Sequence, residues 1–211
     1  MFDTNSDKRM IKFLIYFSAL ILLLLMSPNS FAEGNSGLKQ HIQTVPEGYV
    51  GIYSKKDLNL IRKDLSCNYI LMNDIHFTES DFKEGGSYYN NGNGWKPLGS
   101  FSGTFDGNGY TINGLEIYSL KGIASSNCGL FAHNSGTIKN LGMSGTLISL
   151  NTDSSSNTGS IAGSNSGVIE NCYNTGTISS TLRRGYSATG ASGGITGENI
   201  GNIKNCYNSG A

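Results

Sequence analysis

The stretch GVIENCYNTG occupies residues 167–176, and a close copy of it, GNIKNCYNSG, follows at residues 201–210. A third copy, GTIKNLGMSG, precedes them at residues 136–145, so the copies are spaced by 31 and 34 residues. A sequence period of about 20 to 50 residues indicates a repeat architecture, in which each repeat buries its apolar side chains only against its neighbours. The repeat therefore decides how the rest of the chain is interpreted.

Each repeat holds short strand-forming segments separated by glycine, asparagine and serine. Such segments are too short for helices and suit brief strands joined by corners. If each repeat stacks on the previous one, the backbone pairs with the coils above and below at about 4.8 Å. The predicted fold class is all-β, a right-handed parallel β-helix (a β-solenoid). Ile138, Ile169 and Ile203 are expected to share one interior column.

The repeats also predict where the backbone turns a corner. Strict alternation along a strand would place Ile138 and Leu141 on opposite faces, although both are apolar. Asparagine tolerates the left-handed backbone conformation that a corner needs. We therefore expect Asn140, Asn171 and Asn205 to form a ladder of corners on successive coils.

The N-terminus has the features of an export signal. Three basic residues precede an apolar run at residues 13–26, and small residues lie at positions −3 and −1 of a cleavage site after Ala32. The run is shorter than the roughly 20 residues that span a bilayer, which disfavours the alternative of an uncleaved membrane anchor. The sequence predicts a signal peptide, cleavage after Ala32, and a secreted or cell-surface location without a membrane span in the mature chain.

Residues 54–65, SKKDLNLIRKDL, predict a short amphipathic helix with Ser54 as N-cap and Leu58, Ile61 and Leu65 on one side. We expect this helix to cover the open sheet edge of the first coil. The predicted organisation is a signal peptide at 1–32, a linker at 33–47, an N-terminal cap with the helix and first strand at 48–78, a surface loop at 79–94 and the β-solenoid at 95–211.

Several segments in order, NYILMNDIHF, WKPLG, FSGTFDGNGYTINGLEI, GLFAHNSGTIKNLGMSG and the two NCYN copies, resemble the GLUG-motif repeat family from about Gly48 to the last residue. Its members include similar repeat regions of bacterial surface and secreted proteins, among them adhesin-like proteins and the non-catalytic part of zinc metallopeptidases that cleave immunoglobulin A. The resemblance implies a β-helical extracellular module and no reaction. The H-E-x-x-H signature is absent, and His41, His76 and His133 are isolated in sequence, so the peptidase role does not carry over.

Acidic residues are the candidates for catalysis or calcium binding, and each has a structural interpretation. Glu170 shares its repeat position with Lys139 and Lys204, so stacking sets opposite charges on neighbouring strands. Asp106 is expected to form a turn. We therefore predict no catalytic residue, cofactor or metal ligand. The formal net charge of zero also argues against nucleic acid as a partner.

Cys172 and Cys206 fall at the same repeat position on adjacent coils, where either a disulfide or a buried thiol ladder fits. We favour the ladder, because Leu141 takes this position in the neighbouring copy. The expected partner contacts are an aromatic pair and three residues of an insertion between coils: Tyr173, Tyr207, Arg183, Arg184 and Tyr186.

The function that we predict is an exported, non-enzymatic interaction or adhesion scaffold for a host or cell-envelope protein or glycan. The alternatives are a carbohydrate-active β-helix enzyme, either a polysaccharide lyase or a hydrolase, and an N-terminal module of a larger extracellular metallopeptidase or adhesin. The last repeat stops at Ala211 without a cap, so we expect a fragment of a longer repeat protein. An uncapped last coil also predicts edge-to-edge self-association.

Overall fold

A computed structural model describes residues 41–118, 127–152, 155–182 and 190–211. The chain divides into two compact units, residues 1–39 and 40–211, and the described residues belong to the second. The predicted signal peptide and the insertion residues Arg183, Arg184 and Tyr186 lie outside the described residues.

The described residues form parallel sheets with few helical turns, so the all-β prediction is confirmed. We name the four larger sheets A to D. Sheet A contains β1 (Tyr49–Ile52), β2 (Asn68–Leu71), β5 (Thr104–Asp106), β9 (Thr137–Lys139), β14 (Val168–Glu170) and β19 (Asn202–Lys204). Sheet B contains β3 (Ile75–His76), β6 (Thr111–Asn113), β10 (Gly142–Ser144), β15 (Tyr173–Asn174) and β20 (Tyr207–Asn208). Sheet C contains β7 (Glu116–Tyr118), β11 (Leu147–Thr152) and β16 (Thr177–Leu182). Sheet D contains β4 (Leu98–Phe101), β8 (Phe131–Asn134), β13 (Ala162–Asn165) and β18 (Thr196–Asn199), and β12 (Thr158–Gly159) pairs with β17 (Ser192–Gly193).

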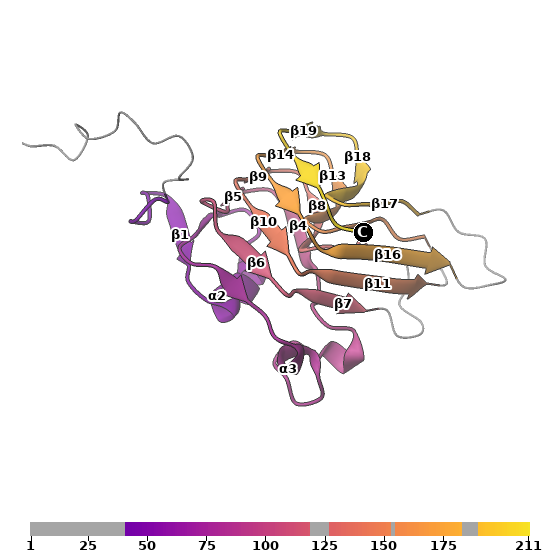
Figure 1. Ribbon diagram of the computed structural model, residues 1–211. Helices are drawn as coiled ribbons and strands as arrows, with labels where there is room; N and C mark the ends of the chain where they lie inside the picture. Colours follow the sequence, from indigo (N-terminus) through magenta and orange to yellow (C-terminus); the bar gives the residue numbers. More distant parts are fainter. Residues whose placement is uncertain (1–40, 119–126, 153–154, 183–189) are drawn as a thin grey trace, which may run out of the picture. The chain divides into compact units, whose positions relative to one another are not determined.

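The chain passes through sheets D, A, B and C in that order and then returns to sheet D, and we call each such circuit a coil (Figure 1). The register places equivalent residues of successive repeats side by side: Ile138 pairs with Ile169, and Ile169 pairs with Ile203. Repeated sequence positions are therefore neighbours in space, as the spacing predicted.

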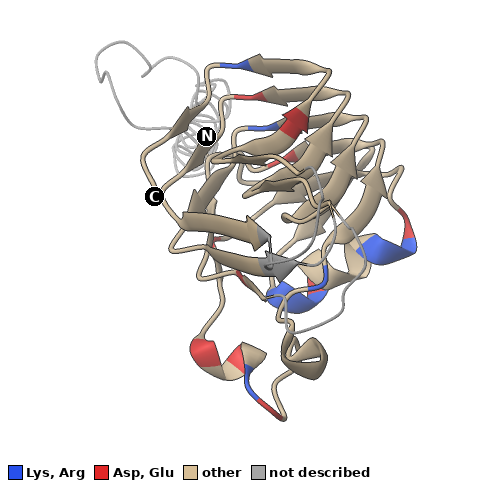
Figure 2. Cartoon of the chain, turned by 90° about the vertical axis from the view of Figure 1, so that its right-hand side faces the viewer, with Lys and Arg blue, Asp and Glu red and all other residues tan. Residues whose placement is uncertain are grey.

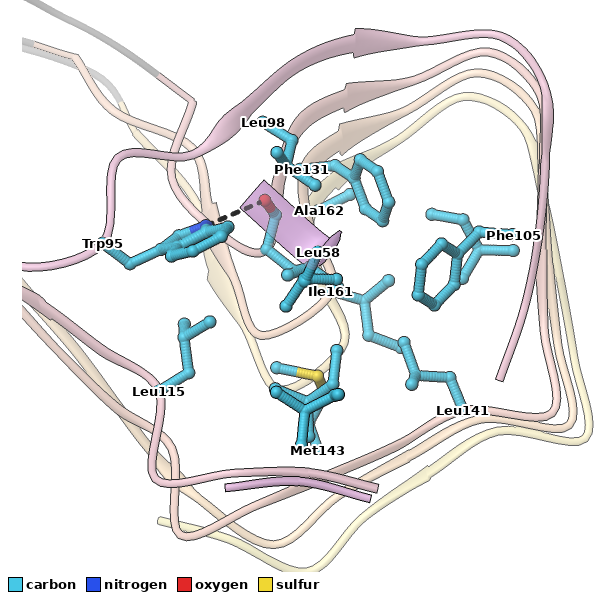
Figure 3. Packing of buried hydrophobic residues seen from close by; sticks show 14 of the residues in the cluster. Leu58, Trp95, Leu98, Phe105, Leu115, Phe131, Leu141, Met143, Ile161 and Ala162 are labelled. Carbon is cyan, nitrogen blue, oxygen red and sulfur yellow. Dashed lines mark hydrogen bonds between the residues drawn. The ribbon is translucent and has the colours of Figure 1, made fainter. Parts of the chain in front are cut away.

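Apolar side chains from all four sheets fill the space inside the coils (Figure 3). Phe105 and Phe131 meet edge to face, with ring centroids 5.6 Å apart. Trp95 is buried and donates its indole N–H to the carbonyl of Leu130 at 3.4 Å. Most inward positions are apolar, and their burial holds the coils together without a disulfide among the described cysteines.

The predicted N-terminal helix is present but short. Helix α2 (Lys55–Leu60) continues as a 3₁₀ turn, η2 (Ile61–Lys63), and the Ser54 side chain accepts a hydrogen bond from the backbone N–H of Asp57. Leu58 and Ile61 are fully buried. The helical segment packs beside β4, the first strand of sheet D, whereas β1 is the first strand of sheet A. It therefore lies against the first strand of sheet D.

Residues 79–94, which we predicted as a surface loop, contain more structure than expected. Helix α3 (Glu79–Phe82) begins with a capping box between Thr78 and Asp81, and the turn η3 (Asn90–Gly92) follows. Phe82 is buried and stacks on Phe77 with ring centroids 5.5 Å apart. The interpretation as a loop missed the capping box, whose acidic residue at the third helical position is an aspartate instead of the more usual glutamate or glutamine.

Candidate functional site

The NCYN copies build a corner between sheets A and B. Asn140, Asn171 and Asn205 have φ angles of 54°, 54° and 50°, so each adopts the left-handed conformation. The side-chain amide of Asn171 donates to Oδ1 of Asn140 at 3.3 Å, and that of Asn205 donates to Oδ1 of Asn171 at 3.2 Å. The first coil of the ladder uses a carboxylate instead, because Asn140 donates to Oδ1 of Asp106 at 3.0 Å. The corner is thus a continuous hydrogen-bonded ladder.

A column of alternating charge runs beside this corner on sheet A (Figure 2). Asp106, Lys139, Glu170 and Lys204 are register partners on successive strands. The ammonium group of Lys139 lies 3.5 Å from Oδ2 of Asp106. Asp106 also accepts a hydrogen bond from the backbone N–H of Asn108 at 2.8 Å, which closes the turn that the sequence predicted there. Asp106 and Lys139 are thus engaged with one another, and Glu170 and Lys204 continue the alternation of charge on the next two strands.

Cys172 and Cys206 lie in one column and are free thiols in the structure. Cys172 is buried, and the Cys206 side chain contacts the backbone carbonyl of Lys204 at 3.1 Å. A hydrogen bond from the thiol of Cys172 lowers the pKa of Cys206 to about 7. The same hydrogen bond, together with burial, raises the pKa of Cys172. Cys206 is therefore the thiol of this pair that ionises first.

Tyr173 and Tyr207 stack on the outer face of sheet B, with ring centroids 5.3 Å apart and ring planes inclined by 8°. Their column continues through Gly142, and an added Cβ at Gly142 would lie 2.5 Å from the Tyr173 ring. Gly142 thus leaves room for the Tyr173 ring. Tyr207 remains 57% exposed, so the aromatic pair ends in an open ring on the last coil.

Two further asparagine ladders were missed by sequence reasoning. At the corner between sheets D and A, Asn134 donates to Oδ1 of Asn165, and Asn165 donates to Oδ1 of Asn199, both at 2.7 Å. Asn174 donates to Oδ1 of Asn208 at 2.7 Å in the same way. Each of these side-chain amides also donates to the carbonyl of a glycine two residues on, so a recurring N-x-G pattern is the signal that would have located them.

A polar cluster on the outer face of sheet D was also missed. Nδ1 of His133 lies 2.7 Å from Oγ of Ser164, and its Nε2 lies 3.1 Å from Oγ of Ser166. A serine that contacts a histidine nitrogen at this distance is an arrangement found in nucleophilic catalysis. The backbone N–H groups of Ser166 and Gly167 both donate to the carbonyl of Asn134 and are therefore engaged within the stack. The cluster connects two successive coils.

In the part of the chain that the structure describes, no group of three or more histidine, cysteine or acidic residues is placed to hold a metal ion. None of the helices found among the described residues is long and apolar enough to cross a membrane.

Comparison with known proteins confirms the resemblance noted in the sequence. Residues 154–179 match the family model of the GLUG motif. The chain is 32% identical over 135 residues to halomucin from Haloquadratum walsbyi, an alignment that covers 59% of this chain. It spans only 1% of the length of halomucin. No solved structure gives a significant match to the chain.

Proposed function

We propose that this GLUG-motif chain is an exported, right-handed parallel β-helix that acts as a non-enzymatic interaction scaffold at the cell surface. Crossover connections between parallel strands of one sheet are right-handed in about 98% of cases, which supports the proposed hand of the coils. The similarity to halomucin over 135 residues supports a role as one repeat region of a surface-associated protein. Its partner is a protein or glycan of a host or of the cell envelope.

The observation that carries this proposal is that polar side chains on the coils are engaged in hydrogen bonds and ion pairs between the coils. Asp106 is the clearest case, because its carboxylate is buried and is held by Asn108, Asn140 and Lys139. A glycosidase needs two accessible carboxyl groups on either side of its substrate. Here Lys139 lies between Asp106 and Glu170 in the same column. This arrangement favours a scaffold over the carbohydrate-active enzyme.

The contact surface that we propose consists of the stacked Tyr173 and Tyr207 and of Arg183, Arg184 and Tyr186 in the insertion that follows β16 in sequence. Aromatic rings with a polar edge suit both sugars and protein surfaces. Loops on a rigid repeat carry binding residues more often than the scaffold itself does. The ring of Tyr173 packs closely over Gly142, and the ring of Tyr207 stacks on that of Tyr173.

Binding and turnover measurements test the proposal together. The purified chain is applied to a glycan array and to immobilised cell-envelope and host extracellular proteins, and the same preparation is incubated with a polysaccharide panel in the presence of calcium. We expect binding without turnover, and weaker binding after joint replacement of Arg183, Arg184, Tyr186 and Tyr207 by alanine. Tyr53→Ala is the matched control, because Tyr53 is a tyrosine with a similar exposed fraction of 53% on the first coil. Turnover of any polysaccharide would refute the scaffold role, and unchanged binding by the quadruple variant would refute the proposed surface.

A further inference from the structure

The polar cluster of His133, Ser164 and Ser166 on the outer face of sheet D joins β8 to β13. Strands β4 and β18 flank this pair of strands, so the cluster lies within the stack. Only 7% of Ser164 is exposed, and Asn127 lies over the neighbouring Gly163, where an added Cβ would meet Cβ of Asn127 at 2.4 Å. Water is therefore largely excluded from the Ser164 hydroxyl, whose hydrogen bonds have to come from the protein.

The partners at the two ends of this cluster fix the direction of its hydrogen bonds. At one end, the side-chain amide of Asn127 donates to Oγ of Ser164 at 2.9 Å. At the other end, the hydroxyl of Ser166 donates to the carbonyl of Asn134 at 3.3 Å, since a carbonyl oxygen can only accept. Every proton then has an acceptor when Ser164 donates to Nδ1 of His133 and the Nε2–H group donates to Ser166. The partners therefore select a neutral imidazole that carries its proton on Nε2.

We propose that His133 is a pH-sensitive brace, which joins two coils while its ring is neutral and holds them less firmly once the ring is protonated. Histidine is the side chain that ordinarily changes its charge between about pH 5 and 8. Protonation places a hydrogen on Nδ1, so that Ser164 faces a second donor in addition to Asn127. Within the described part of the chain, Oγ of Ser164 has hydrogen bonds only to these two side chains, so its own proton is left without an acceptor. A buried polar proton without an acceptor is destabilising.

The loss of the acceptor at Nδ1 sets the sign of the pH dependence. In the unfolded chain the imidazole and the Ser164 hydroxyl both exchange hydrogen bonds with water, so protonation strands no group there. Protonation therefore disfavours the folded chain relative to the unfolded chain. The brace contributes fully at a pH above the range in which histidine titrates, and this contribution is lost as the pH falls through that range. The contact with Ser166 persists in both states, because Nε2 of His133 donates in both.

The ionisable groups around His133 do not offset this effect. The strands on either side, β4 and β13, carry no ionisable side chain. Glu198 of β18 lies in the same row but two strands away, a distance of about 10 Å, and its carboxylate accepts a hydrogen bond from Asn157 at 2.8 Å. An exposed carboxylate at this distance is largely screened at physiological ionic strength. The segment beside Asn127 contributes Cys128, and burial raises the pKa of this thiol, so it stays uncharged.

Urea denaturation of the full chain at pH 7.5 and at pH 5.0 tests the brace. Between these two values, the folding equilibrium constant of the unaltered chain is expected to fall about fivefold more than that of His133→Gln, because only the unaltered chain gains the stranded proton. Every other ionisable group is common to both chains, so its contribution cancels in the comparison. His76→Gln is the matched control, because His76 is exposed and lies on sheet B, and it is expected to keep the full pH dependence.

Equal pH dependence in the unaltered chain and in His133→Gln would overturn the proposal, and so would loss of the dependence in His76→Gln. A measurement on the unaltered chain keeps the test decisive if His133→Gln fails to fold. NMR of the imidazole nitrogens of the full chain, labelled with ¹⁵N, identifies which ring nitrogen carries the proton at pH 7.5. We expect the proton of His133 on Nε2 and a bare Nδ1. A proton on Nδ1 at this pH would refute the brace, because the Ser164 hydroxyl would then have no acceptor to lose.

Discussion

Replacement of Asn165 by alanine tests whether buried amides hold the coils together. Asn165 is fully buried at the corner between sheets D and A. Its Oδ1 accepts from Asn134 at 2.7 Å, its Nδ2 donates to Asn199 at 2.7 Å, and it also reaches the carbonyl of Gly167 at 3.3 Å. The side chain therefore connects three successive coils, and alanine removes all of these bonds.

The expected loss in the free energy of unfolding depends on which hydrogen bonds the neighbours of Asn165 keep after the substitution. Each of the two short amide bonds contributes about 1 kcal/mol net. Asn134 retains contacts to the carbonyls of Gly136 and Val168, and the carbonyl of Gly167 still accepts from the backbone N–H of Asn202. The penalty for groups left without a partner is therefore small. We expect Asn165→Ala to lower the free energy of unfolding by about 2 to 3 kcal/mol, which corresponds to a fall in Tm of about 4 to 12 °C for a chain of this size.

Urea denaturation followed by circular dichroism gives the free energy, and differential scanning calorimetry gives Tm. Asn73→Ala is the control, because Asn73 is exposed and makes a single 3.3 Å bond to the carbonyl of Tyr53. An exposed substitution of this kind is expected to change the free energy by less than about 0.5 kcal/mol. If Asn165→Ala were no more destabilising than Asn73→Ala, the reasoning that the ladder of Asn134, Asn165 and Asn199 holds successive coils together would be refuted.

Three other predictions concern the core, the thiols and the first coil. Ile169→Ala empties a fully buried position in the interior column and is expected to cost about 2 to 5 kcal/mol in the same urea titration; a loss below about 1 kcal/mol would contradict the packing. Since the pKa of Cys206 is lowered to about 7, iodoacetamide is expected to label Cys206 increasingly as the pH rises through about 7, whereas Cys172 reacts only after denaturation; equal labelling rates measured by peptide mass spectrometry would disprove this. Burial raises the pKa of Asp81, but its bonds to Lys55 at 2.8 and 2.9 Å and to backbone lower it overall, so this carboxylate stabilises the fold above its unfolded pKa of about 4 and ceases to do so as the pH falls through its lower folded pKa. Asp81→Asn is accordingly expected to cost about 1 kcal/mol at pH 7 and less at acidic pH, and a cost that does not depend on pH would contradict the assignment.

The sequence by itself determined which residues are equivalent. The spacing of the NCYN copies predicted the pairing of Ile169 with Ile203, and the asparagine between two apolar residues predicted the left-handed corner at Asn140. These predictions succeed because residues that are one repeat apart in sequence lie opposite each other on neighbouring strands.

Only the tertiary structure decided which way side chains point at the corners and which residues of different coils they contact. The buried amide ladder through Asn165, the contact between His133 and Ser166, and the position of α2 beside β4 all join residues from different coils whose side chains meet only after the coils stack. Sequence spacing gives the row in which a residue lies, but not whether its side chain points inward or outward at a corner, because the left-handed residues break the simple alternation of a strand.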